Sequence, residues 1–343
     1  MNRFRISCFV TIVLCSLLFV GVSAVKPASA ATQVKPITLS FNCYITPAYF
    51  QYQNVKDWMD LVTERAAGRL KFKFFPAGQL LSATATWDGV RERRVDMGYI
   101  YGGYVSGNDP YFGFWDANTF SFDDFAHAQR ALDGGLFALA DEACRTNKTH
   151  LLSTTLYGYE ALHTRDRQIK MTGDLKGLKI RGPSKPGNEL VNDLGGVGIF
   201  TPSSELYMAL QKGTIDGVIT SADTAVSRKL YEVLKYTLDI PINIGLGFTF
   251  INLDAWNNIP KDLQDLITKA SKDVDQKYIS LYLKSHKDSM ETLAKNGVTI
   301  TRLTPKELAP WKEASKAVME SWMPTYKQSK KIVEIVEKTR AVK

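Results

Sequence analysis

Short alternating segments and longer segments with helical periodicity follow one another along almost the whole chain. Residues 37–41 and 70–74 alternate between apolar and polar side chains, which predicts two strands. Between them, residues 54–67 place apolar side chains at helical spacing, and Gly68 is a typical residue for a helix end. Strands that alternate with helices in this way predict an α/β fold.

The same pattern continues to the C-terminus. Further strands are expected at residues 95–100, 151–156, 178–180, 195–200, 215–219 and 246–253. Further helices are expected at residues 84–94, 123–147, 203–212 and 263–293, and another after Pro324. The helix at 263–293 would measure about 45 Å, long enough to lie across two domains. Ser203 or Ser204 is expected to cap its helix, and Thr304 and Glu307 have the spacing of a capping box.

The first thirty residues have the composition of a secretory signal. Arg3 and Arg5 precede an uncharged, mostly apolar run over residues 6–25, and Ala28-Ser29-Ala30 offers the small residues of a cleavage site. We therefore predict a cleavable signal peptide at residues 1–30 and a periplasmic protein, with an uncleaved membrane anchor as the alternative. Roughly 310 residues would remain, which suits two domains.

Charge and cysteine content narrow the choice of partners. The net charge of +8 falls to about +5 without the signal, and the basic residues stand beside acids along predicted helices. This pattern is typical of solvated helix faces, so no nucleic-acid partner is expected. Export would permit one disulfide between Cys43 and Cys144, although two buried thiols are the favoured interpretation.

Sequence motifs give no reaction to assign. The chain has four histidines, none with metal-ligand spacing to another histidine or to a cysteine pair. It also lacks the nucleophile turn G-x-S-x-G, a Walker-type loop and G-x-G-x-x-G. We expect a protein that is not an enzyme, with no cofactor and no metal site, and keep a secreted α/β enzyme as an alternative.

Arg181 is the strongest candidate for ligand binding. It ends the predicted strand at 178–180 and precedes Gly182-Pro183. Side chains at the carboxyl ends of strands in an open α/β sheet face the ligand crevice. A guanidinium group is always charged and fits a carboxylate through two parallel hydrogen bonds. A surface arginine paired with an acid would be the alternative reading of the spacing.

Aromatic and hydroxyl side chains near predicted strand ends could form the rest of a binding site. Aromatic walls supply contact area with little polar demand. The aromatic candidates are Tyr44, Trp87, Tyr99, Tyr101 and Tyr157. The polar candidates are Thr220, Ser221 and Asp223. Asp223 could hold an amine or hydroxyl group of a ligand, or it could cap the helix that follows.

Six segments together resemble one known family, the DctP-like substrate-binding proteins of TRAP transporters. They are PAGQLL at 76–81, VDMG at 95–98, LKGLKIRGP at 175–183, FTPSSELYMALQKGTIDG at 200–217, KLYEVLKY at 229–236 and NNIPKDLQDLI at 257–267. One such segment would be weak evidence, whereas six in the family's order, spread over nearly the whole mature chain, are strong evidence.

The resemblance implies a periplasmic binding protein fold with two domains, a cleft, hinge strands and a long helix across both domains. We expect domain I to comprise residues 31–155 plus 243–283, and domain II to comprise 156–242 plus 284–343. The resemblance also implies that Arg181 clamps a ligand carboxylate, that the cleft closes by hinge motion, and that the receptor delivers its ligand to a sodium-coupled TRAP permease. Either a monomer or a dimer through the C-terminal helix would fit.

Two departures from the family's pattern bear on the ligand. Many members carry an asparagine just after the Asp-Gly that matches Asp216-Gly217, where this chain has Val218. Some members have a second arginine near the position of Glu160 and Ala161, and this chain has none there. Both departures disfavour a sialic-acid-like or C4-dicarboxylate ligand. We predict a monocarboxylate, with aromatic and 2-oxo acids as candidates, and keep presentation of the ligand to a membrane sensor as an alternative role.

Overall fold

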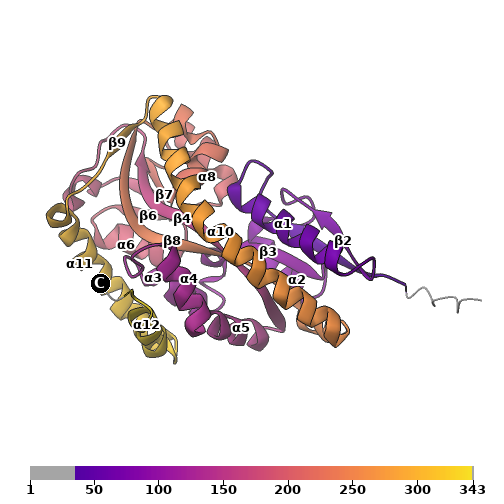
Figure 1. Cartoon of the computed structure of the whole chain (residues 1–343). Coiled ribbons are helices and arrows are strands. Elements are labelled where there is room, and N and C mark those ends of the chain that lie inside the picture. Colours follow the sequence, from indigo (N-terminus) through magenta and orange to yellow (C-terminus); the bar gives the residue numbers. More distant parts are fainter. Residues whose placement is uncertain (1–34, 342–343) are drawn as a thin grey trace, which may run out of the picture. The chain divides into compact units, whose positions relative to one another are not determined.

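The computed structural model describes residues 35–341, so the predicted signal peptide lies outside the described residues. Strands and helices alternate as expected, and the fold is α/β (Figure 1). The strands are β1 (Ile37–Cys43), β2 (Leu70–Phe75), β3 (Met97–Tyr101), β4 (Thr149–Thr164), β5 (Lys179–Gly182), β6 (Val197–Phe200), β7 (Gly217–Ser221), β8 (Tyr236–Asn252) and β9 (Thr299–Thr301). No helix between residues 35 and 341 combines the length and apolar character that crossing a membrane would need.

The helices cover the sheet and connect its strands. They are α1 (Phe50–Arg65), α2 (Thr86–Arg91), α3 (Pro110–Ala117), α4 (Phe125–Ala131), α5 (Phe137–Thr146), α6 (Lys185–Asp193), α7 (Leu206–Gln211), α8 (Ala222–Ser227), α9 (Leu253–Asn257), α10 (Lys261–Lys295), α11 (Pro305–Trp322) and α12 (Ser329–Lys338). The helix expected after Pro324 is therefore present as α12.

The strands form one sheet in the order β2-β1-β3-β8-β4-β7-β5-β6, with β9 alongside β8. At one end β1 pairs in parallel with β2 and β3, and at the other end β5 pairs in parallel with β6 and β7. We call β1–β3 with the adjoining ends of β4 and β8 the first half, and β5–β7 with the opposite ends of β4 and β8 the second half. The boundaries predicted for the two domains stay a prediction.

Strands β4 and β8 join the two halves. They were expected as short strands at residues 151–156 and 246–253, but each is more than twice as long as predicted. Glycine and proline residues near the middle of these segments are typical of turns. In the structure, shifts of register between the two strands absorb these irregularities, one of them between Leu156 and Tyr159. The pairing therefore continues through the point where the halves meet.

Helix α10 confirms the predicted long helix and packs against α1 of the first half and α8 of the second (Figure 1, orange). The indole Nε1 of Trp58 in α1 donates a 2.9 Å hydrogen bond to Ser271 Oγ in α10. A single rigid element thus contacts both halves.

Helix ends and interruptions were predicted less well. The helix expected at 123–147 is interrupted by a π-helical turn between α4 and α5, where Gly135 adopts a φ of 137°, which only glycine tolerates easily. Ser203 and Ser204 lie in a 3₁₀ turn before α7 and form no side-chain cap, so that prediction was wrong. The capping box of Thr304 and Glu307 is confirmed at the start of α11.

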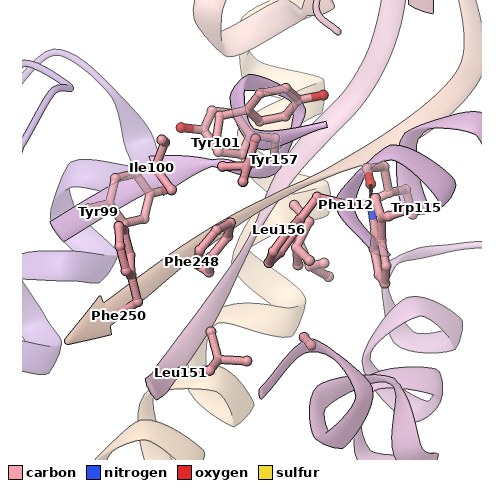
Figure 2. Packing of buried hydrophobic residues seen from close by; sticks show 14 of the residues in the cluster. Tyr99, Ile100, Tyr101, Phe112, Trp115, Leu151, Leu156, Tyr157, Phe248 and Phe250 are labelled. Atoms are coloured by element: carbon pink, nitrogen blue, oxygen red, sulfur yellow. Dashed lines mark hydrogen bonds between the residues drawn. The ribbon is translucent and has the colours of Figure 1, made fainter. Parts of the chain in front are cut away.

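Aromatic packing dominates the core beside β3 and β8. The rings of Phe112 and Phe248 stack with centroids 4.5 Å apart (Figure 2), and Trp87 packs on Phe250 at 5.1 Å. Cys43 and Cys144 are both free and buried, which confirms the favoured interpretation as buried thiols.

Candidate functional site

A narrow pocket lies where the two halves of the sheet meet. It contains about 310 Å³ of non-atom space, part of which is open to solvent. Its lining residues are Tyr44, Tyr49, Tyr101, Tyr104, Tyr157, Glu160, Arg181, Pro183, Ser203, Thr220, Ser221 and Thr224. They come from the segments that follow β1, β3, β5 and β6, from the strands β3, β4, β5 and β7 themselves, and from α8. The pocket thus gathers aromatic, hydroxyl and charged groups from distant parts of the sequence.

Arg181 lies at the carboxyl end of β5, and its side chain is almost completely buried, with 3% of its surface exposed. Its Nε donates to the carbonyl oxygen of Thr201 over 2.9 Å, and Nη1 donates to that of Ile219 over 3.1 Å. Across residues 35–341, no Asp or Glu oxygen lies within 4.0 Å of the guanidinium nitrogens. The alternative of a surface arginine paired with an acid is therefore wrong.

These two hydrogen bonds orient the Arg181 side chain and leave part of its guanidinium group available to a ligand. Nη2 makes no hydrogen bond with any residue from 35 to 341 and belongs to a side chain that lines the pocket. Arginine side chains are rarely buried without a counter-ion, because removing a cation from water costs several kcal/mol. An anionic group of a ligand bound in the pocket would supply a partner in direct contact with the guanidinium.

Tyrosines form the wall opposite the polar strand ends. Tyr44 and Tyr157 share a 2.8 Å hydrogen bond between their hydroxyl oxygens. The rings of Tyr101 and Tyr157 meet edge to face at 5.2 Å and lie beside one another (Figure 2), and Tyr104 meets Tyr101 at 5.8 Å. Burial raises the pKa of Tyr44, Tyr101 and Tyr157, so these hydroxyl groups are neutral hydrogen-bond donors.

Glu160 lines the pocket but was not among the predicted binding residues. Its position was mentioned only because some family members carry an arginine near it. The Tyr101 hydroxyl donates to Glu160 Oε1 over 2.7 Å, and Asp116 lies behind the same hydroxyl, with Oδ2 at 3.4 Å. Burial raises the pKa of Glu160 to about 8 and that of Asp116 to about 7, and repulsion from Asp116 adds to the shift of Glu160. The site therefore holds two buried carboxyl groups close to one tyrosine.

Six of the nine predicted binding residues line the pocket, and three do not. The six are Arg181, Tyr44, Tyr101, Tyr157, Thr220 and Ser221. Trp87 belongs to the aromatic core, and Tyr99 lies beneath Tyr44, with the two rings stacked at 6.2 Å.

Asp223 does not cap α8, and it lies outside the lining of the pocket. Ser221 occupies the N-cap position of α8, and Asp223 lies in the first turn. It does not line the pocket, its Oδ2 has no hydrogen-bond partner among residues 35–341, and burial raises its pKa. Asp223 is thus a buried acid behind Ser221.

Within residues 35–341, no three His, Cys, Asp or Glu side chains are placed to hold a metal ion together. Glu160 and Asp116 are only two such groups, and Tyr101 lies between them. The arrangement instead offers one buried cation, hydrogen-bond donors and aromatic faces to a small organic molecule.

Comparison with known proteins identifies many relatives. Residues 41–325 match the family model DctP, described as bacterial extracellular solute-binding protein, family 7. The 2,3-diketo-L-gulonate-binding periplasmic protein YiaO of Escherichia coli is 26% identical over 286 residues, covering 83% of this chain and 86% of that protein. A monocarboxylate 2-oxoacid-binding periplasmic protein of Nostoc is 27% identical over 259 residues, covering 71% of this chain and 67% of that protein.

Solved structures share the fold. A Bordetella pertussis extracytoplasmic solute receptor that binds pyroglutamic acid superimposes with a TM-score of 0.82 at 19% identity, covering 88% of this chain and 99% of that chain. A TRAP periplasmic solute-binding protein of Desulfovibrio salexigens with bound orotic acid also gives a TM-score of 0.82, at 24% identity, covering 88% of this chain and 98% of that one. These likenesses show that the chain has the two-domain α/β fold of these solved structures.

Proposed function

Because this chain belongs to the bacterial extracellular solute-binding protein family 7 (DctP), whose members are TRAP receptors and not enzymes, we propose that it binds a small organic monocarboxylate outside the cytoplasm and delivers it to a TRAP-type sodium-coupled permease. The observation that carries the proposal is the buried Arg181, which lines the pocket without a carboxylate partner within 4.0 Å among residues 35–341.

A single strong cation favours one carboxylate group over two. Arg181 is the only arginine or lysine among the pocket-lining residues. A second carboxylate in the same ligand would have to lie in a pocket that already contains Glu160. Each charge-assisted hydrogen bond from the guanidinium contributes about 1.5–3 kcal/mol, while micromolar binding needs about 8 kcal/mol.

The tyrosine wall supplies further binding free energy. Five of the lining side chains are tyrosines, which combine apolar contact area with a hydroxyl donor. Such a wall suits a ligand with a ring or a partly apolar body, as in aromatic or 2-oxo acids. Relatives whose names mention a 2-oxoacid, pyroglutamate or orotate support a small organic acid as the ligand.

The experiment is a thermal-shift screen of the mature protein against a library of organic acids, followed by titration calorimetry of each hit. Arg181→Ala should raise the Kd of a hit by about 10- to 150-fold, the value of one charge-assisted hydrogen bond. Arg69→Ala, which removes a surface arginine paired with Asp262, is the matched control and should bind normally.

Full-strength binding by Arg181→Ala would contradict the carboxylate clamp. Turnover of a bound acid, detected by mass spectrometry, would contradict a receptor. Co-purification of the protein with the two membrane subunits of a TRAP permease, dependent on ligand, would support delivery.

A further inference from the structure

The pocket presents an acidic side chain, Glu160, as well as the permanently charged Arg181. Glu160 on β4 pairs across the sheet with Ser221 of β7, and Arg181 on β5 pairs with Val218 of the same strand. Strand β7 therefore lies between the two charged residues, and both line the pocket. They do not form an ion pair with each other, since more than 4.0 Å separates their charged atoms.

One carboxyl oxygen of Glu160 already accepts a hydrogen bond, and the other is available to a ligand. Its side chain is buried, with 5% of its surface exposed, and Oε1 accepts the hydrogen bond of Tyr101. No residue from 35 to 341 forms a hydrogen bond to Oε2, and that atom is not among the fully buried polar atoms that lack a partner. Because a carboxylate is costly to bury unless it is hydrogen-bonded, Oε2 is an acceptor that a ligand can use.

Aromatic faces surround the same region. Tyr101 meets both Tyr104 and Tyr157 edge to face, with interplanar angles of 79° and 78°, and Tyr44 meets Tyr104 at 72°. The rings therefore present faces in several directions around one space. The face of an aromatic ring attracts cations, and cages of such rings bind ammonium groups.

The charges around the pocket also disfavour a simple anion. Burial raises the pKa of both carboxyl groups, and repulsion from Asp116 raises that of Glu160 further, so Asp116 and Glu160 do not both ionise near neutral pH. The pair then carries one negative charge, which offsets that of Arg181. A plain carboxylate would leave this buried region with an unbalanced charge, whereas a zwitterion would not.

We propose that the ligand is a zwitterion, a small acid that also carries a cationic nitrogen, with its carboxylate on Arg181 and its nitrogen on Glu160 Oε2 among the tyrosine rings. This inference rests on the proposed receptor function and narrows its ligand class to amino, imino or betaine-type acids. Glu160 would then decide specificity, and Arg181 would supply the general affinity for acids.

The test uses pairs of acids that differ in the cationic nitrogen and hardly in shape. The pairs are L-proline with (S)-tetrahydrofuran-2-carboxylate, glycine betaine with 3,3-dimethylbutanoate, and 4-(aminomethyl)benzoate with 4-ethylbenzoate. Calorimetry of the mature wild-type protein should give at least one pair in which the cationic member binds about 10-fold more tightly or better. Glu160→Gln, which keeps the shape and the acceptor for Tyr101, should reduce that preference to less than about 3-fold.

A control and a wider screen make every outcome decisive. Glu313→Gln removes an exposed carboxylate on α11 and should leave the preference unchanged. If none of the six compounds binds, the organic-acid library takes their place, and hits that contain a basic nitrogen support the inference.

Equal binding within the pairs, preference for the neutral members, or hits that all lack a basic nitrogen would overturn the zwitterion inference. In each of these cases the proposed function would stand, provided that binding still needs Arg181. A library without any hit would contradict the proposed function and the inference together.

Discussion

The guanidinium of Arg228 contacts Tyr49 in two ways: Nε donates to the tyrosine hydroxyl over 2.6 Å, and the central carbon lies 5.1 Å from the ring centroid. Tyr49 follows β1 in the first half of the sheet, and Arg228 follows α8 in the second half. A second contact joins the halves nearby, where the backbone N–H of Ser203 donates to the Tyr104 hydroxyl over 3.0 Å. Both tyrosines line the pocket, so these contacts join the two halves of the sheet beside it.

Removing the Arg228 contact should weaken ligand binding without removing any group that touches Arg181. We expect Arg228→Ala to raise the Kd of a ligand about 3- to 30-fold, because a hydrogen bond to a charged group and a cation–π contact favour the closed state. Stopped-flow fluorescence should show that the change lies mainly in the dissociation rate. Arg65→Ala, which removes a surface ion pair between α1 and α10, is the control. An unchanged dissociation rate for Arg228→Ala would argue that the contact between Arg228 and Tyr49 does not stabilise the closed state.

A single added methyl group at Gly245 should disturb the tyrosine wall. A Cβ atom there would lie 2.8 Å from Tyr101 Cε2, 3.2 Å from Tyr157 Cβ and 3.3 Å from Glu160 Oε1. The ring of Tyr101 would have to move, at a cost of about 1–3 kcal/mol in the free energy of unfolding. Urea denaturation of Gly245→Ala measures this cost, and calorimetry should show weaker ligand binding as well.

The matched control is Gly107→Ala. No heavy atom lies within 4 Å of a Cβ built at Gly107, and that residue does not have a positive φ. Its substitution should therefore leave both the stability and the affinity close to wild type. Equal effects at Gly107 and Gly245 would show that the close approach to Tyr101 does not cause the loss of stability and affinity.

Local sequence pattern was enough to place Arg181 at a strand end and to name three tyrosines of the wall, but it could not separate them from Trp87 and Tyr99. A charged residue directly after an apolar strand and before Gly-Pro can be assigned to a strand end without knowledge of the fold. Alternation along β3 places Tyr99 and Tyr101 on the same face of the strand, yet only Tyr101 lines the pocket. Tyr99 is covered by Tyr44 and lies against Gly247 of β8, contacts that depend on the tertiary structure.

Glu160 shows why the rest of the site could not be predicted. Its hydrogen-bond partner Tyr101 is 59 residues away in the sequence, and Asp116 approaches from a third segment. The strand that carries Glu160 was predicted to cover only residues 151–156, which leaves Glu160 outside it. Only the continuous pairing of β4 with β7 and β8 brings the carboxylate to the pocket.

The two buried carboxyl groups should make the free protein less stable as the pH rises. Their pKa values in the folded state, about 8 for Glu160 and about 7 for Asp116, lie above those of free carboxyl groups. The folded protein therefore holds more protons than the unfolded chain above about pH 4, and the free energy of unfolding falls as the pH approaches the folded pKa values. Below about pH 6.5 this trend is opposed by His163, because burial lowers its pKa to about 4.

The most informative window is thus from about pH 7 to about pH 8, where His163 is largely neutral in both states. In this window we expect the free energy of unfolding of the wild-type protein to fall by at least about 1 kcal/mol, measured by urea denaturation without ligand. Glu160→Gln removes one of the titrating carboxyl groups, so the free energy of unfolding of this variant should fall clearly less. Glu313→Gln, at an exposed position, should follow the wild-type curve. Parallel curves for the wild type and Glu160→Gln would mean that Glu160 is already ionised in the empty pocket. Asp116 and Glu160 would then share no proton, and the charge balance with Arg181 on which the zwitterion inference draws would be wrong.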